Sequence, residues 1–128
     1  MGVYVFGTVG EYVKVGHHLV TPRRPNAYYR VAGRGFFSVK HPPELDGVLG
    51  MRDLELIAWY PLLSRADETA THKRCKERYG EFHPKSELES ILSFLDGRGE
   101  RVSLTEADKM KAIRWAGKRK AKRRRKVA

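Results

Sequence analysis

The sequence predicts an α+β domain with a small three-stranded antiparallel sheet flanked by helices, followed by a basic C-terminal helix. Three observations predict this class. Two short runs rich in Val, Tyr and Phe flank a glycine-containing turn near the N-terminus, and a third apolar run, LELIAWYP, lies between breakers farther on. A helix-start signal precedes a strongly basic tail. With 128 residues, the chain is long enough for one domain with a hydrophobic core.

The N-terminal third predicts a hairpin and a short helix. The runs at 3–6 and 12–16 have strand composition and are close enough to pair across their turn. The prolines within 17–25 predict a loop, because they exclude the interior of a regular helix or strand. Asn26 is expected to cap a helix over 27–33 that ends at glycine.

The remaining elements are one strand and three helices. Residues 54–61 predict a mostly buried strand, and a helix is expected over 65–78. Each of the last two helices is expected to begin with a capping box, in which a serine and a glutamate three residues later bond the first-turn N–H groups: Ser86 with Glu89, and Ser103 with Glu106. The glycines at 97 and 99 predict a boundary between a domain at 1–97 and a basic helix and tail at 98–128.

The excess positive charge is concentrated at the C-terminus. Residues 109–128 hold eleven Lys and Arg and no acid, which accounts for the whole net charge of +11. Residues 1–43 add six basic residues against one acid. Such clusters suit a polyanion, although a charge run can also serve only solubility. The residues expected to bind nucleic acid are Arg23, Arg24, Arg34, Lys118, Arg119, Lys120, Lys122, Arg123, Arg124, Arg125 and Lys126.

The apolar runs and the cysteine content of the chain indicate its cellular location. No apolar run approaches the length of a membrane span, and the N-terminus lacks the pattern of a signal peptide. The single cysteine, Cys75, cannot form an internal disulfide. We expect a soluble intracellular protein, cytoplasmic in a bacterial or phage setting, and nuclear or virion-associated in a eukaryotic virus.

Three short motifs occur in a suggestive order. GVY (2–4) lies on the first predicted strand and KVG (14–16) on the second, and ETATH (68–72) is followed by GEF (80–82). This order resembles the GIY-YIG nuclease family, and more closely its branch with a lysine in the second signature. The resemblance covers about residues 2–95. It implies a GIY-YIG-like fold and nuclease domain, with hydrolysis of phosphodiesters that depends on Mg²⁺ or Mn²⁺.

The resemblance also assigns roles to individual residues. It implies that Tyr4 activates a water molecule, that a helical arginine holds the phosphate, and that Glu68 holds one divalent metal ion. His72 is expected one helical turn from Glu68, where it would orient the glutamate or contact a phosphate. The simpler alternatives are that Tyr4 only packs a sheet face and that Glu68 and His72 form a surface hydrogen bond.

Lys14 stands where the family more commonly has a tyrosine. We expect it directly opposite Tyr4 in the hairpin, where it would attract the phosphate and lower the pKa of the phenol. The alternative is a solvated edge lysine that discourages strand pairing.

The catalytic arginine has more than one candidate. Arg30 is favoured, because it lies inside the predicted helix and an apolar residue follows it. Arg24 and Tyr28 are alternatives by their spacing after the hairpin, although Pro25 pushes Arg24 out of helical geometry.

Two functions and one metal alternative follow. The favoured function is a small Mg²⁺- or Mn²⁺-dependent DNA endonuclease or nickase of phage, viral or mobile-element origin, with DNA favoured over RNA and with no membrane or small-molecule cofactor. The alternative is a catalytically inactive GIY-YIG-like protein that binds nucleic acid in packaging, in a virion or at a ribosome. A zinc site is a separate possibility and would draw on His17, His18, His72, Cys75 and His83.

Overall fold

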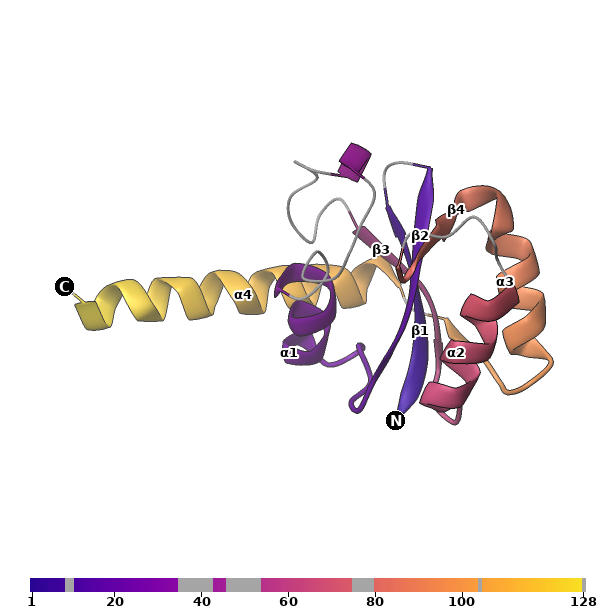
Figure 1. Ribbon diagram of the computed structural model, residues 1–128. Helices are drawn as coiled ribbons and strands as arrows, with labels where there is room; N and C mark the ends of the chain where they lie inside the picture. Colours follow the sequence, from indigo (N-terminus) through magenta and orange to yellow (C-terminus); the bar gives the residue numbers. More distant parts are fainter. Residues whose placement is uncertain (9–10, 35–42, 46–53, 75–79, 104, 128) are drawn as a thin grey trace.

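The N-terminal hairpin lies in the centre of a larger antiparallel sheet. The structure, a computed structural model, describes residues 1–8, 11–34, 43–45, 54–74, 80–103 and 105–127. Within them the sheet has the strand order β4-β2-β1-β3-β5 (Figure 1). The strands are β1 (Gly2–Thr8), β2 (Tyr12–His18), β3 (Leu54–Tyr60), β4 (Phe82–Pro84) and β5 (Val102–Ser103).

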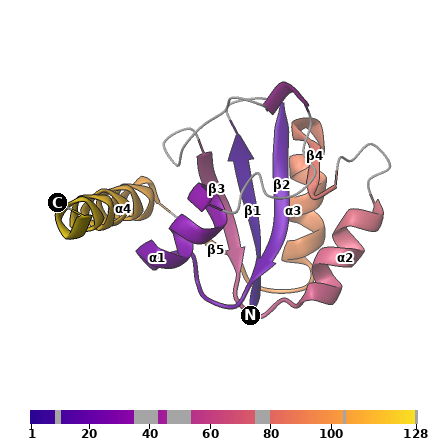
Figure 2. The ribbon, with the colours of Figure 1, turned by 60° about the vertical axis from the view of Figure 1, so that its left-hand side comes forward.

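Helices cover both faces of this sheet. They are α1 (Pro25–Tyr28), which continues as a wider helical turn over Tyr29–Arg34, then α2 (Arg65–Arg74), α3 (Leu88–Asp96) and α4 (Glu106–Val127). Single turns of 3-10 helix lie at Pro43–Leu45 and Lys85–Glu87. Figures 1 and 2 show α1 and α4 on one side of the sheet and α2 and α3 on the other, with α4 projecting beyond the body.

The α+β class is confirmed, but the three-stranded sheet is wrong. Two further strands extend it: β4 pairs with β2, and β5 pairs with β3. They are three and two residues long, too short for the alternation of apolar and polar residues that reveals a strand. Their pairing therefore depends on the longer strands beside them.

The core consists of two apolar layers, one on each face of the sheet. The α1 face holds a buried cluster that includes Phe6, Tyr28 and Trp59, and the other face holds one that includes Val5 and Leu95. A register irregularity between Val5 and Phe6 in the β1–β3 pairing brings Leu56 into the same cluster as Trp59, three residues farther on.

Three of the expected helix starts differ from the structure. The first helix begins two residues earlier than predicted, with Arg24 at the N-cap and Pro25 in the first turn in place of an Asn26 cap. Ser86 lies in the 3-10 turn before α3, whose N-cap is Glu87 without a side-chain bond. Ser103 belongs to β5.

The observed caps use aspartates three residues after a hydroxyl side chain. The backbone N–H of Thr105 donates to Asp108 Oδ2 at 2.9 Å before α4, and the N–H of Ser64 donates to Asp67 Oδ2 at 2.7 Å before α2. Sequence pattern favoured serine with glutamate, but the shorter aspartate side chain fills the same role here.

The segment after Gly97 packs on the preceding part of the chain. β5 hydrogen-bonds to β3, and Ala112 of α4 is fully buried in the core cluster on the α1 face. The boundary predicted at 97 stays a prediction, but the beginning of the C-terminal segment shares this sheet and core. Several predicted features lie outside the described residues: the end of the helix expected over 65–78, Cys75, and much of the loop before β3. Among the helices that are described, none has the length and apolarity to cross a bilayer.

We expect Gly16→Ala to destabilise the fold. A Cβ atom at this position would lie 2.3 Å from the hydroxyl oxygen of Tyr4, so the ring or the strand must shift, at a cost of about 1–3 kcal/mol. Urea unfolding followed by circular dichroism measures this change. Gly117→Ala is the matched control, because a Cβ there meets nothing within 4 Å and should leave stability equal or slightly higher. Equal stability of the two variants would contradict the close contact.

Candidate functional site

The candidate site lies where β4 stops pairing with β2. β4 pairs only with Tyr12–Lys14, and Glu68 of α2 bonds to His17, farther along β2. Side chains from β1, β2, α2 and β4 and from the turn before β4 meet here. We call this the β2-edge site, and its residues are Tyr4, Lys14, Gly16, His17, Glu68, His72, Glu81 and His83.

Tyr4 lies on β1 with its ring over the backbone of β2. Its direct partner across the strands is Gly16, and the absence of a side chain there lets the ring lie against the strand. Only 5% of the residue is exposed. Burial raises the pKa of the Tyr4 phenol well above its ordinary value, and the negative charges of Glu81 and Glu68 add to this effect. The hydroxyl is therefore protonated at neutral pH.

Lys14 is buried beside this ring, but not at the predicted position. Its direct cross-strand partner is Phe6, and the expected opposition to Tyr4 is wrong. Tyr4 and Lys14 are diagonal neighbours on one face, with Lys14 Nζ 5.8 Å from the Tyr4 ring centroid. The alternative of a solvated edge lysine does not fit either, because Lys14 is 2% exposed.

Lys14 forms an ion pair with Glu81. The Nζ atom lies 3.7 Å from Glu81 Oε2. Burial lowers the pKa of Lys14 below its ordinary value, and the attraction of Glu81 partly opposes this. Lys14 was expected to lower the pKa of the Tyr4 phenol; burial and the two carboxylates instead leave that pKa raised. Gly80, at φ 61°, makes the turn that returns Glu81 to β2.

Glu68 is a buried carboxylate held by two imidazoles. Its Oε2 bonds to His17 Nδ1, and its Oε1 lies 3.4 Å from His72 Nε2. Burial by itself raises the pKa of Glu68. The hydrogen bonds from His72 and His17, with the attraction of their charge, outweigh it, so the pKa lies below its ordinary value. Glu68 is therefore ionised at neutral pH.

A third imidazole extends this arrangement into the core. His72 Nδ1 lies 2.7 Å from Nε2 of His83, and the two ring planes are nearly parallel, at 5°. When His72 is neutral and donates through Nε2 to Glu68, its Nδ1 is an acceptor, so His83 donates to it. A connected series of hydrogen-bonding groups therefore runs from His17 through Glu68 and His72 to His83.

His17 was not predicted as a partner of Glu68, and Glu81 and His83 had no predicted role in the favoured site. His17 follows Gly16 directly, so the alternation of strand side chains places it on the face of β2 opposite Gly16. This alternation could be read from the sequence. The packing of α2 on this side of β2 could not, because it depends on the tertiary structure.

The candidate arginines lie on the other side of the sheet from α2. Arg30 is exposed on the helical turn after α1, which packs near α4 (Figure 2). Arg23 and Arg24 are exposed just before α1, and the Arg24 carbonyl accepts the first helical N–H bond. Tyr28 is 1% exposed and packs edge-on against Phe6 in the core, where substrate cannot reach it without rearrangement.

The basic residues of the tail lie along α4. Lys118 and Arg119 are exposed, and the Arg119 guanidinium lies 5.4 Å from the Trp115 ring centroid. Lys120, Lys122, Arg123, Arg124, Arg125 and Lys126 belong to the same helix by their backbone, and their side chains lie outside the description, as does that of Arg34.

Few of the described side chains near Glu68 are placed to act as further metal ligands. Asp67 is not a second ligand, because Ser64 N–H and Arg98 Nε donate to it at 2.7 and 2.6 Å. Among the residues the structure describes, no group of three or more histidine, cysteine, aspartate or glutamate side chains is arranged to hold a metal ion. One carboxylate is still enough for Mg²⁺, which keeps several water ligands. A cation on Glu68 would replace an imidazole contact.

Three of the donors proposed for zinc, His17, His72 and His83, lie in the β2-edge site, but among the described residues no three such donors are arranged to hold a metal ion. His17 contacts Glu68, and His72 pairs with His83, while His18 Nδ1 lies 3.0 Å from the carbonyl oxygen of Val20 in the loop after β2. Cys75 lies outside the described residues.

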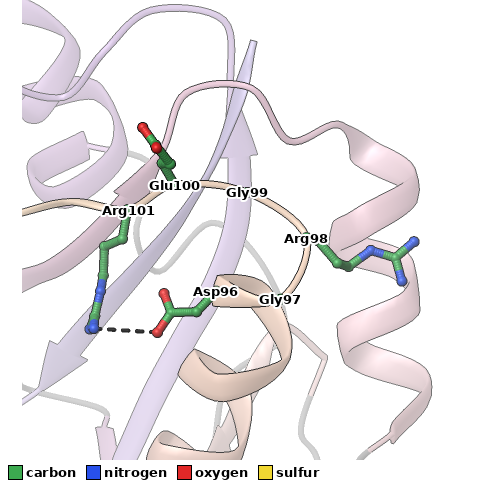
Figure 3. A pocket seen from close by; sticks show the side chains of 6 residues that line it. All are labelled: Asp96, Gly97, Arg98, Gly99, Glu100 and Arg101. Atoms are coloured by element: carbon green, nitrogen blue, oxygen red, sulfur yellow. Dashed lines mark ion pairs between the residues drawn. The ribbon is translucent and has the colours of Figure 1, made fainter.

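The surface hollow in Figure 3 is a separate feature, and it is lined by Asp96–Arg101. Both of its arginines form ion pairs, Arg101 with Asp96 and Arg98 with Asp67.

Comparisons of the chain with protein-family models, with curated proteins and with solved structures give no match. The GIY-YIG resemblance therefore rests on the motifs alone.

We expect Glu68→Gln to lower stability at neutral pH by about 2 kcal/mol, because hydrogen bonds to a buried charge are lost. The pKa of Glu68 is depressed in the folded state, so its contribution is present above the ordinary value of 4.5 and is lost as pH falls through the folded pKa. Urea unfolding at pH 7 and at successively lower pH should show the difference from the native chain shrinking below about pH 4.5. Glu89→Gln, an exposed site in the first turn of α3, is the control. A difference that does not change with pH would contradict the assignment.

Proposed function

We propose that this protein is a metal-dependent endonuclease or nickase that hydrolyses phosphodiester bonds, with DNA as the favoured substrate. One observation carries the proposal. Tyr4, Lys14 and Glu68, which come from three separate elements, gather at one strand edge with their ionisation shifted by burial and by one another. Groups with perturbed pKa values gathered in this way are typical of catalytic sites.

Lys14 is suited to attract the phosphate. Its ammonium is nearly excluded from water, so its field is screened far less than that of a surface lysine. Glu81 favours the charged form of Lys14 and remains about one-third exposed itself. A phosphate that approached Lys14 could take over part of this pairing.

Tyr4 is suited to donate a hydrogen bond at neutral pH. Because its pKa is raised, the phenol keeps its proton and can orient a water molecule or contact a phosphate oxygen. Accepting a proton from the attacking water would require a positive charge near the hydroxyl. Glu68 lies near enough to influence the phenol, so a cation on Glu68 would act in this direction.

Glu68 is the residue that would hold Mg²⁺ or Mn²⁺. It is ionised at neutral pH, and a bound divalent ion would neutralise the charge that develops on the phosphate. His72 and His17 orient the carboxylate. The arginine of the site stays a proposal, with Arg30 favoured over Arg24 and Tyr28.

A second candidate function is nucleic-acid binding without cleavage. Two observations favour it: both carboxylate oxygens of Glu68 are engaged by imidazoles, and α1, which is flanked by Arg24 and Arg30, lies across the sheet from α2. The basic helix α4 would serve this function equally well.

We expect the purified protein to nick supercoiled plasmid in the presence of Mg²⁺ or Mn²⁺. Glu68→Gln and Tyr4→Phe should each lower the rate by about a hundredfold or more, because each removes a group acting at the reacting phosphate. Tyr60→Phe is the matched control, since it removes the hydroxyl of another buried strand tyrosine that bonds Asp96 on the opposite face. Agarose electrophoresis of the nicked form measures all four proteins.

The outcomes separate the two candidates. Nicking that is absent from the native chain, or unchanged in Glu68→Gln, contradicts the nuclease. Metal-independent DNA binding by a chain that does not nick would support the second candidate.

We expect Lys14→Met to separate activity from stability. Methionine fills a similar volume, and the Glu81 carboxylate that loses its partner is about one-third exposed and can be hydrated, so stability should fall by no more than about 1 kcal/mol. Nicking should fall at least about tenfold because the phosphate loses its cation. Parallel urea unfolding and plasmid assays test this, and retained nicking would remove Lys14 from the site.

A further inference from the structure

Helix α4 has two parts with different surroundings. Its first part packs on the body: Ala112 is fully buried, and the Trp115 ring lies 5.5 Å from the ring of Tyr29, centroid to centroid. At Gly117 an added Cβ would meet nothing within 4 Å, and Lys118 and Arg119 are exposed. We call Gly117–Val127 the arm. Figure 1 shows it projecting away from the sheet.

The direction of the arm is set by the packed part. The Tyr29–Trp115 contact joins α4 to the helical turn after α1, and Asp108 bonds the N–H of Thr105 at the start of the helix. The helix is continuous over its 22 residues, about 33 Å in length. An arm of about 16 Å thus leaves the body as a straight rod.

The charge of this region is of one sign. No acid follows Asp108, and the helical segment from α1 to Arg34 contains none. Cations at intervals of four, such as Lys118, Lys122 and Lys126, repel one another by about 0.2–0.5 kcal/mol per pair in a free helix. A polyanion beside the arm would relieve this repulsion.

Composition excludes a bilayer as the preferred partner. A helix that lies on a membrane needs a broad apolar face with large side chains. In the arm the only apolar side chains are those of Ala121 and Val127. Anionic groups held in a line, as in a nucleic acid, match the arm better.

The aromatic residue beside the arm favours a duplex over a single strand. Proteins that bind single strands stack bases on open aromatic rings. Trp115 is half-buried, with Tyr29 and the Arg119 guanidinium both against its ring. It is therefore a structural contact rather than an open stacking platform, and a cationic helix fits the major groove of a duplex.

We propose that α4 is a rigid duplex-binding arm, held in direction by Trp115, so that its cations and the exposed arginines Arg24 and Arg30 contact the same double-stranded nucleic acid. This inference rests on the proposed function only in taking nucleic acid as the partner. It requires no cleavage.

Two substitutions at one position test the arm. Gly117→Pro keeps every charge but breaks or kinks the helix where it leaves the body, whereas Gly117→Ala keeps it straight. The full-length variants are titrated into fluorescein-labelled duplex and single strand of equal length, in EDTA at moderate salt, by fluorescence anisotropy. Working in EDTA keeps failure of the nuclease proposal separate from failure of this one.

The expected result has two parts. The native chain and Gly117→Ala should bind duplex at least about tenfold more tightly than single strand, and Gly117→Pro should lose about tenfold in duplex affinity. Equal affinity of the Pro and Ala variants, equal or tighter binding of single strand, or tighter binding of phosphatidylserine vesicles than of duplex would each overturn the proposal.

A coupling measurement tests the shared duplex. Arg30→Ala should weaken duplex binding more in the native chain than in Trp115→Ala, because α1 and the arm act together only when the contact fixes their geometry. Additive effects would overturn this part. Circular dichroism of Trp115→Ala establishes that the variant is folded.

Discussion

The close approach of the Tyr4 ring to the backbone of Gly16 is the constraint on which the rest of the β2-edge site depends. A side chain at Gly16 would push the ring off β2, since a Cβ there would fall 2.3 Å from the phenol oxygen. With the ring against the strand, Lys14 fits between Tyr4 and Phe82 on the same face. The phenol also stays near enough to Glu68 for that carboxylate to raise its pKa.

The charges at this edge are costly for a sheet of this size. Lys14 and Glu68 are 2% and 6% exposed, and desolvating each ion costs several kcal/mol before pairing offsets it. Glu81 and the two imidazoles provide that pairing. An apolar edge would serve stability as well. Strong, weakly screened charge of this kind is what the proposed phosphodiester chemistry needs.

The C-terminal helix has two parts that differ in their apolar content. Where α4 has apolar side chains, such as Ala112 and Trp115, it packs on the body. Beyond Gly117 the sequence offers almost no apolar surface, so no packing energy holds the helix against the sheet. The exposed cations Lys118 and Arg119 at its start are accessible to a polyanion.

The sequence by itself determined the α+β class, the hairpin, the third strand, and the pairing of Glu68 with His72, because alternation and helical spacing are local properties. It could not determine the hairpin register. Moving Lys14 from opposite Tyr4 to opposite Phe6 is a shift of two residues, which leaves every side chain on the same face and the pattern unchanged. Only the tertiary structure decided that register, the two short edge strands, and the approach of α2 that brings Glu68 to His17. Each of these depends on contacts between segments far apart in the chain, and such contacts leave no periodic signal in the sequence.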